Sequence, residues 1–337
     1  MFTLAMLLAV AGPAAGSTGW GVAVQVNEGE AVPPAAVLSA VLPKAGTVRD
    51  MLQWARVEKL PGVYGVPAED FQLYQVVAST GGGNVITLFG GNPLYGLPNA
   101  NFPVTPAQLQ GFAAYAAYLV ANDGGTVPDA QAANIPHLAG VTIWNEFNGG
   151  YGGGIVGKNR PAAMAKLLSV VVPAIKKSNR TVKISAGAFV GHSGVAHWFA
   201  AIGQGFNWKQ ADWLDIHPYI YEAKGAKGWA REMGALREAG ISNPCYYSEW
   251  GGPSAVKFMA ANPRANYFQW FQQNIIAADS VTPKGGNFFE LSNLPHFAGQ
   301  GLTTGHSGKP AYQWTGLGLQ FTSTFLPWVA SRGKDTD

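Results

Sequence analysis

Eight short apolar runs, separated by longer segments with helical spacing, constrain the fold of this chain most strongly. Most of the runs are apolar almost without a break up to their C-terminal ends, which is typical of parallel strands buried on both faces. The runs cover residues 19–26, 47–54, 84–91, 141–146, 183–189, 213–219, 245–251 and 287–293. This pattern predicts an α/β fold and fits a (β/α)8 TIM barrel; an open, doubly wound sheet is the alternative that alternation leaves open.

The segments between the runs carry helix signals. Thr105 and Pro106 predict an N-cap and a first helical turn. Apolar residues then recur at three- and four-residue spacing up to Val120, which predicts one buried helix face. Residues 161–177, 225–239, 263–278 and 311–330 continue the helical pattern, and Pro173 and Pro327 inside two of them predict a kink or an early end. No change of composition marks a linker, so we expect one domain over residues 17–333.

Composition and charge exclude several classes of protein. The apolar content of 47% is high enough to bury a core, which excludes a disordered chain. Only 12% of the residues are charged, against about 25% in ordinary proteins. The net charge is +3 without a block of Lys or Arg, so nucleic-acid binding is not expected. One Cys allows neither an internal disulfide nor a zinc ribbon. Low charge with 12% aromatic residues suits an uncharged, polyhydroxylated ligand.

The N-terminus has features of a secretion signal. Residues 2–12 are apolar, and small residues and a proline follow at 13–17. The run is shorter than the ~20 residues that span a membrane, and we expect no membrane span elsewhere. No Lys or Arg precedes Lys44, unlike in a typical signal peptide, so a buried apolar segment is the alternative. We therefore expect residues 1–16 to be a signal peptide or an apolar N-terminal segment, and the protein to be secreted or periplasmic.

Two glutamates stand at the ends of apolar runs in a chain that has only 19 acidic residues. Glu146 ends the fourth run and Glu249 lies near the end of the seventh. In a barrel these strands lie nearly opposite each other, so both carboxylates face the axis. Two carboxylates that flank one bond are what glycosidic cleavage requires, one as an acid and one as a nucleophile or base. The alternative is a structural role for both in buried ion pairs with Arg49 or a lysine.

Several motifs resemble those of clan A glycoside hydrolases, which are (β/α)8 barrels that cleave with retention of configuration. The Trp-Asn-Glu motif at 144–146 and the Ser-Glu-Trp-Gly motif at 248–251 resemble the paired signatures of that clan. Residues 47–64 resemble the second-strand region of glycoside hydrolase family 39 and of glycosidases associated with exopolysaccharides. Residues 215–219 resemble the sixth-strand element of the clan.

This resemblance implies roles for individual residues. Glu146 resembles the acid/base and Glu249 the nucleophile. Asn145 resembles the residue that hydrogen-bonds the 2-hydroxyl of the sugar, and Arg49 would keep Glu249 ionised because a nearby cation lowers a carboxyl pKa.

Further residues are candidates for orienting the carboxylates or binding sugar. His217 or Tyr219 would orient a carboxylate, although a histidine at a strand end can also simply bond the backbone. Aromatic rings can stack on sugar faces, but each is also a candidate for the core. The substrate-binding candidates are Trp250, Tyr151, Trp198 and Asn92.

No cofactor or metal is predicted. Residues 152–158 match a phosphate-binding loop, but Asn159 stands where Ser or Thr would be needed and the Trp-Asn-Glu motif precedes it. His192 and His197 have no carboxylate between them. The sequence therefore predicts a retaining glycoside hydrolase that acts on a β-linked polysaccharide or oligosaccharide. The alternatives are a transglycosylase, a catalytically silent barrel that binds exopolysaccharide, and an unrelated α/β hydrolase or NTPase.

Overall fold

The computed structural model describes residues 19–43, 46–98, 100–122, 132–151, 159–191, 194–219, 226–262, 265–291, 301–303 and 315–332. The predictions for the N-terminal segment 1–16, the glycine-rich segment 152–158 and His192 lie outside these ranges. Among the helices within them, none is both long enough and apolar enough to cross a lipid bilayer.

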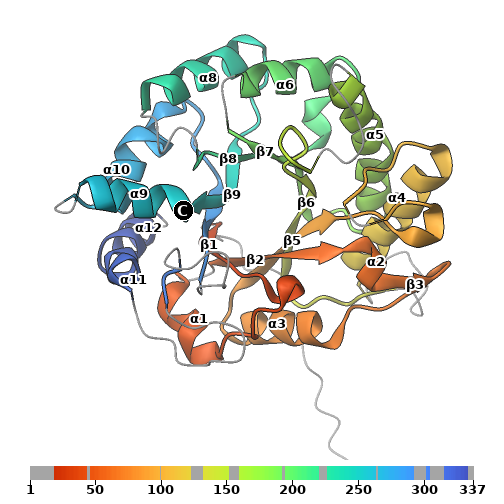
Figure 1. The fold of residues 1–337 in the computed structure, drawn as a ribbon, viewed down its shortest axis with the longest axis horizontal. Coiled ribbons are helices and arrows are strands. Elements are labelled where there is room, and N and C mark those ends of the chain that lie inside the picture. The colour runs from red at the N-terminus through yellow and green to blue at the C-terminus, as the bar shows by residue number, and fades with distance from the viewer. Residues whose placement is uncertain are drawn as a thin grey trace, which may run out of the picture.

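Eight parallel strands close into a barrel in the order β1-β10-β9-β8-β7-β6-β5-β2 (Figure 1). Each predicted run overlaps one strand, and β1 pairs with both β2 and β10, so the predicted closed barrel is confirmed and the open sheet is excluded. The strands are β1 (Trp20–Ala23), β2 (Thr47–Gln53), β5 (Gly83–Phe89), β6 (Leu138–Asn145), β7 (Lys183–Val190), β8 (Trp213–His217), β9 (Cys245–Gly251) and β10 (Gly285–Phe289).

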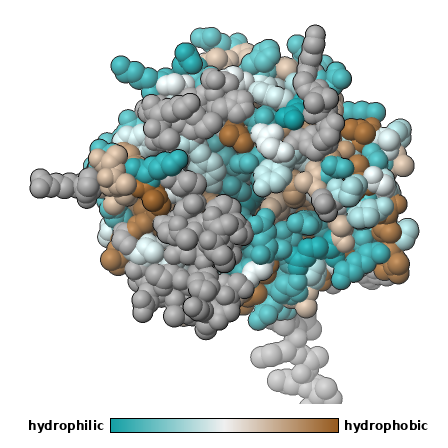
Figure 2. Space-filling view, viewed as in Figure 1, coloured by the Kyte–Doolittle hydropathy of each residue, from teal (hydrophilic) through white to brown (hydrophobic). Residues whose placement is uncertain are grey.

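Helices surround the barrel and cover the outer faces of its strands (Figure 1). They are α1 (Ala35–Val41), α2 (Trp54–Val57), α3 (Ala68–Ser79), α4 (Pro106–Val120), α5 (Arg160–Ser178), α6 (Val195–Gly203), α8 (Ala226–Glu238), α9 (Pro253–Ala261), α10 (Tyr267–Asn274), α11 (Gly316–Gln320) and α12 (Leu326–Arg332). A small hairpin of β3 (Glu58–Leu60) and β4 (Val63–Tyr64) follows α2. In Figure 2, coloured hydrophilic residues gather around the middle of the visible face, and the hydrophobic ones form separate patches.

Helix α4 begins where the sequence predicts. The Thr105 hydroxyl accepts a hydrogen bond from the backbone N–H of Gln108, and the Gln108 side chain accepts one from the backbone N–H of Thr105. This reciprocal capping satisfies two N–H groups that would otherwise lack partners at the start of the helix.

Neither Pro173 nor Pro327 ends its helix early. Helix α5 continues through Pro173 to Ser178. Proline removes one backbone hydrogen bond, but Val171, Val172 and Ile175 around it are buried, and their packing offsets that loss. Pro327 is the second residue of α12, and α12 directly follows a π-helical turn, η8 (Phe321–Phe325). An irregular turn rather than a helix end therefore lies next to this proline.

The barrel interior contains hydrogen-bonded polar side chains. Near the N-terminal ends of the strands, the Tyr246 hydroxyl lies 2.6 Å from Asn287 Oδ1 and 3.2 Å from Thr47 Oγ1. A second polar group lies farther along the strands, toward their C-terminal ends. In a TIM barrel this end carries the active site.

Candidate active site

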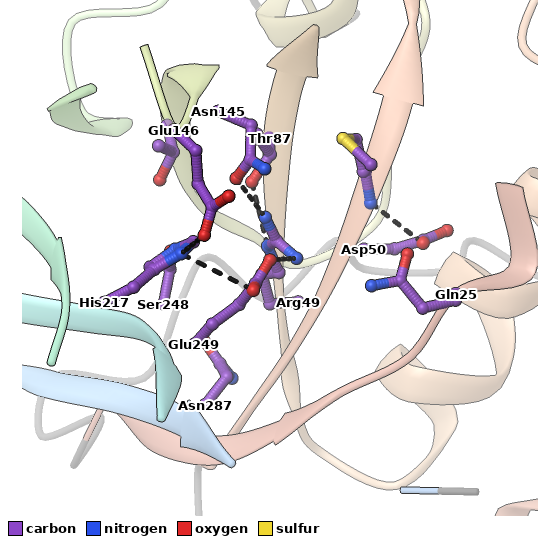
Figure 3. Close-up of polar contacts among 12 residues, drawn as sticks. Gln25, Arg49, Asp50, Thr87, Asn145, Glu146, His217, Ser248, Glu249 and Asn287 are labelled. Atoms are coloured by element: carbon purple, nitrogen blue, oxygen red, sulfur yellow. Dashed lines mark hydrogen bonds and ion pairs between the residues drawn. The ribbon is translucent and has the colours of Figure 1, made fainter. Parts of the chain in front are cut away.

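Six predicted site residues meet near the C-terminal ends of four strands; all of them except Tyr219 are labelled in Figure 3. They come from parts of the chain up to about two hundred residues apart, and closure of the barrel brings them together. The six are Arg49 on β2, Asn145 and Glu146 at the end of β6, His217 at the end of β8, Tyr219 just beyond it, and Glu249 on β9.

Arg49 organises one side of this group. Its side chain is completely buried, and its Nη1 lies 2.5 Å from Glu249 Oε1. Its Nη2 donates to Asn145 Oδ1 at 3.0 Å and its Nε to Thr87 Oγ1 at 2.9 Å. The guanidinium therefore has partners on β5, β6 and β9, which fixes it in a single orientation.

Glu249 is surrounded by groups that favour its ionised form. Burial alone would raise its pKa, but the charges of His217 and Arg49 and the hydrogen bonds from Tyr219 and Arg49 outweigh burial and lower the pKa below its ordinary value. The Tyr219 hydroxyl donates to Glu249 Oε2 at 3.1 Å. Glu249 is therefore held as a carboxylate at neutral pH.

Glu146 has different surroundings. Its side chain is 21% exposed, against 10% for Glu249, and its Oε1 lies 3.0 Å from His217 Nδ1. One oxygen of Glu146, one oxygen of Glu249 and one nitrogen of His217 all lie within 4.8 Å of one another. Glu146 is therefore the more accessible of the two carboxyl groups to a bound molecule or to water.

The backbone that presents Glu146 is unusual. Trp144 and Glu146 have φ angles of 71° and 44°, in the left-handed region that side chains disfavour. Packing holds them there: the Trp144 ring lies 4.8 Å from that of Phe102 between ring centres, and its Nε1 donates to the Tyr151 carbonyl at 2.9 Å. Fixed backbone at this point sets the direction of the Glu146 side chain.

His217 lies between the two glutamates and is completely buried. Its Nδ1 is 3.0 Å from Glu146 and 3.5 Å from Glu249, and its Nε2 is 3.0 Å from Ser248 Oγ. Burial would lower the pKa of His217, but the charges of Glu249, Glu146 and Asp215 raise it above the ordinary value. The contacts of both ring nitrogens are thus with side chains, and the predicted alternative of a simple backbone contact is not seen among the described residues.

Glu146, His217 and Glu249 also form the one group with the spacing of metal ligands in the described part of the chain. The Arg49 guanidinium already pairs with Glu249, and its positive charge would repel a metal cation placed there. The arrangement suits proton transfer and the stabilisation of charge better than metal binding.

The structure corrects the prediction that Trp250 binds substrate. Trp250 is completely buried, and its ring stacks on that of Phe271 with the ring centres 4.2 Å apart. Phe288 and Phe325 pack around it at 5.2 and 4.9 Å. Successive residues of a strand point to opposite faces, so Trp250 points out to the helices where Glu249 points into the barrel.

Asn92 is also separate from the glutamates. Its Oδ1 accepts from the Leu94 N–H and its Nδ2 donates to the Glu58 carbonyl at 2.8 Å. The side chain caps the short helix η2 (Pro93–Tyr95) and ties it to β3. This structural role replaces the predicted one in substrate binding.

Tyr151 and Trp198 differ in their distance from the site. Tyr151 is 43% exposed, and the pKa of its hydroxyl is raised by burial and then by the charge of Glu146, which places it near that glutamate. Trp198, on α6, is half-buried and its ring lies 6.4 Å from that of Phe147. Tyr151 thus borders the site, whereas the described contacts of Trp198 are with the core.

Sequence reasoning missed three side chains that support the site. Asp215 and Ser248 lie within the quoted motifs but had no role assigned to them, and Thr87 carried no motif at all. Thr87 contacts Arg49, Ser248 contacts His217, and the Ser248 N–H donates to Asp215 Oδ1 at 3.0 Å. Only the register of the barrel strands reveals these contacts.

Comparisons with known proteins identify the fold. No family model and no curated protein sequence matches the chain. A family 39 glycoside hydrolase from Bacteroides cellulosilyticus matches with a TM-score of 0.57 and 19% identity over 82% of this chain. An exo-β-1,4-mannosidase from an Opitutaceae bacterium matches with a TM-score of 0.62 and 16% identity over 94%. A family 39 β-xylosidase from Caulobacter crescentus matches with a TM-score of 0.58 and 15% identity over 94% of this chain. The fold is that of these glycosidases.

The matched proteins are longer than this chain. It spans 56% of the Bacteroides protein, 62% of the mannosidase and 72% of the xylosidase. At these identities the likeness concerns the fold. A shared fold does not determine the reaction, which depends on the residues of the site.

Replacing Arg49 by Met should raise the pKa of Glu249. The depressed pKa of this carboxyl depends partly on the guanidinium, so the variant should lose the ionised form at a higher pH as the solution is acidified. Carboxyl 13C NMR of Glu249 from acidic to neutral pH measures this. Arg237→Met, which breaks the Arg237–Asp279 pair elsewhere, is the matched control and should leave Glu249 unchanged. An unmoved Glu249 titration in Arg49→Met would contradict the assignment.

Replacing Trp250 by Ala should lower the free energy of unfolding by about 3–5 kcal/mol, because the change leaves a cavity in the aromatic core. Tyr151→Ala removes a residue that is 43% exposed and should change the free energy of unfolding by less, within about 1 kcal/mol. Denaturant unfolding of both variants measures the difference. Equal stability of Trp250→Ala and the wild type would show that the ring does not belong to the core.

Proposed function

We propose that this chain is a retaining glycoside hydrolase that cleaves β-glycosidic bonds of a polysaccharide or oligosaccharide. One observation carries the proposal: two glutamates with unequal surroundings face each other at the C-terminal end of a barrel, with oxygens within 4.8 Å. Retaining glycosidases hold their two carboxyl groups about 5–5.5 Å apart, and inverting ones about 6.5–9.5 Å apart. The close approach of Glu146 and Glu249 therefore favours retention.

The surroundings divide the two roles. Glu249, paired with Arg49 and hydrogen-bonded by Tyr219, acts as the nucleophile because it stays ionised. Glu146, which is more exposed and has no contact with Arg49 among its described partners, acts as the acid/base. Two carboxyl groups whose surroundings differ in this way can perform acid and nucleophilic chemistry at the same pH.

The reaction follows a double displacement. A Glu249 oxygen bonds to the anomeric carbon while the bond to the leaving oxygen breaks, and that oxygen takes the proton of Glu146. Glu146, now a carboxylate, then takes a proton from water as the water oxygen attacks the anomeric carbon and Glu249 departs. Each residue ends in its starting state.

Neighbouring residues would hold the sugar. Asn145 Oδ1 accepts from Arg49, which leaves its amide N–H groups to donate to a sugar hydroxyl, in line with the role implied by the resemblance. The exposed ring of Tyr151 offers a stacking face beside Glu146. These contacts need no charge on the substrate, which suits a neutral polysaccharide.

Replacing Glu249 by Ala should reduce turnover of an aryl β-glycoside by roughly 10⁴-fold or more, because no glycosyl-enzyme can form. Added azide should restore turnover by entering the vacated space, and the product should be a glycosyl azide of inverted configuration. NMR of the product establishes its configuration. A retained azide product would reassign the nucleophile, and full activity without azide would sink the proposal.

Replacing Glu146 by Gln should slow substrates with poor leaving groups by about 10²–10⁴-fold, because these need protonation. Dinitrophenyl glycosides, whose leaving group needs no proton, should be affected much less in the first step. Glu238→Gln, an exposed change on α8, is the matched control and should behave like the wild type. An equal loss for good and poor leaving groups would argue against an acid role for Glu146.

A further inference from the structure

A second group of polar side chains lies behind His217. Asp215 is completely buried; its Oδ1 accepts from the Ser248 N–H at 3.0 Å and its Oδ2 from the Thr142 hydroxyl at 2.8 Å. The Ser248 hydroxyl lies 3.0 Å from His217 Nε2 and also hydrogen-bonds Asp215. Burial raises the pKa of Asp215 above its ordinary value, and the charge of His217 and these hydrogen bonds offset only part of that rise. A continuous chain of contacts therefore runs from Asp215 through Ser248 and His217 to Glu146 (Figure 3 shows its Ser248–His217–Glu146 part).

The directions of these hydrogen bonds determine the protonation of His217. Nδ1 faces oxygens of Glu146 and Glu249, which accept hydrogen bonds, so Nδ1 carries a proton. If Nε2 carries one as well, it donates to Ser248 Oγ, and the Ser248 hydroxyl is then free to donate to Asp215. Every contact is satisfied only when His217 is an imidazolium.

The charges inside the barrel agree with this state. The groups that face His217 are Glu146 from the end of β6, Glu249 from β9, and Asp215 and Tyr219 from its own segment; Arg49 on β2 lies behind Glu249. In the starting state of the proposed mechanism, in which Glu146 serves as the acid, the anions Asp215 and Glu249 balance the cations Arg49 and His217. A neutral His217 would leave one buried negative charge without a partner.

The proposed double displacement, on which this inference rests, moves a negative charge between the glutamates. It starts on Glu249, and after the glycosyl-enzyme forms it resides on Glu146. His217 Nδ1 lies within 3.5 Å of both carboxyl groups and can face either one without moving. A fixed cation at this point stabilises the charge in both states.

We propose that Asp215 and Ser248 are positioning residues that hold His217 as an imidazolium, so that one fixed positive charge serves whichever glutamate is ionised. Asp215 supplies the opposing charge and Ser248 transmits it through a hydrogen bond. Neither residue touches the reacting atoms. Their effect appears in the protonation of His217 and, through it, in the pH dependence of the reaction.

The test is a ¹³C and ¹⁵N NMR titration of the His217 ring in the protein without substrate. Asp215→Asn removes the charge and keeps the shape, and Ser248→Ala removes the link. In both, the His217 midpoint should fall by about one pH unit or more. Ser248→Thr keeps the hydroxyl and should retain the wild-type midpoint. Ser185→Ala removes a buried β7 hydroxyl that has no hydrogen-bond partner in the described part of the chain, and should leave the midpoint unchanged.

Activity gives an independent readout. Because the active form contains the imidazolium, the alkaline limb of kcat/KM should move to lower pH in Ser248→Ala and Asp215→Asn but not in Ser185→Ala. If Asp215→Asn does not fold, the comparison of Ser248→Ala with Ser248→Thr still tests the proposal. An unchanged His217 midpoint in Ser248→Ala, or an equal fall in Ser185→Ala, overturns the proposal.

The two proposals fail separately. The titration needs no substrate, so a protein that hydrolyses no glycoside but shows the expected shifts would overturn the glycosidase function alone. An active glycosidase whose His217 midpoint is the same in Asp215→Asn and Ser248→Ala as in the wild type would overturn only the proposed role of Asp215 and Ser248.

Discussion

A positive charge buried inside the barrel determines how the rest of the site is arranged. The Arg49 side chain has no contact with solvent, so its charge has to be met by protein groups. Its partners come from β5, β6 and β9, and a shift of one residue in any of these strands would turn the partner to the opposite face. The register that closes the barrel therefore also assembles the site, and neither can change without the other.

The same charge makes two chemically identical residues different. Glu249 touches Arg49 and is nearly enclosed, whereas Glu146 stands at a strained backbone position and is partly open to solvent. A carboxyl group beside a guanidinium loses its proton more readily, which lowers the pKa of Glu249. His217 couples the two, because its Nδ1 reaches both and its Nε2 leads back into the barrel.

Much of the fold was predictable because burial on both faces gives parallel strands continuous apolar runs. For the same reason such runs do not say which side chains point inward, and Trp250 was misassigned although it adjoins Glu249 in one motif. Asn92 was misassigned because a polar residue after a strand can stabilise a turn by hydrogen-bonding its backbone, and the sequence does not distinguish this from ligand binding. Asp215 and Ser248 were visible in the sequence, but their contacts with His217 and with each other depend on the pairing of β8 with β9.

The abundance of aromatic residues now has a different explanation from the one that composition alone favoured. Trp54, Trp144, Trp229 and Trp250 are all fully buried. Of the three predicted sugar-binding aromatics, all within the described residues, only Tyr151 combines exposure with nearness to a glutamate. A barrel that holds charged groups in its interior loses part of the hydrophobic stabilisation that an apolar interior would provide. Large rings between the strands and the helices bury much apolar surface and offset that loss. The aromatic shell therefore serves the site indirectly, by stabilising a barrel whose centre is polar.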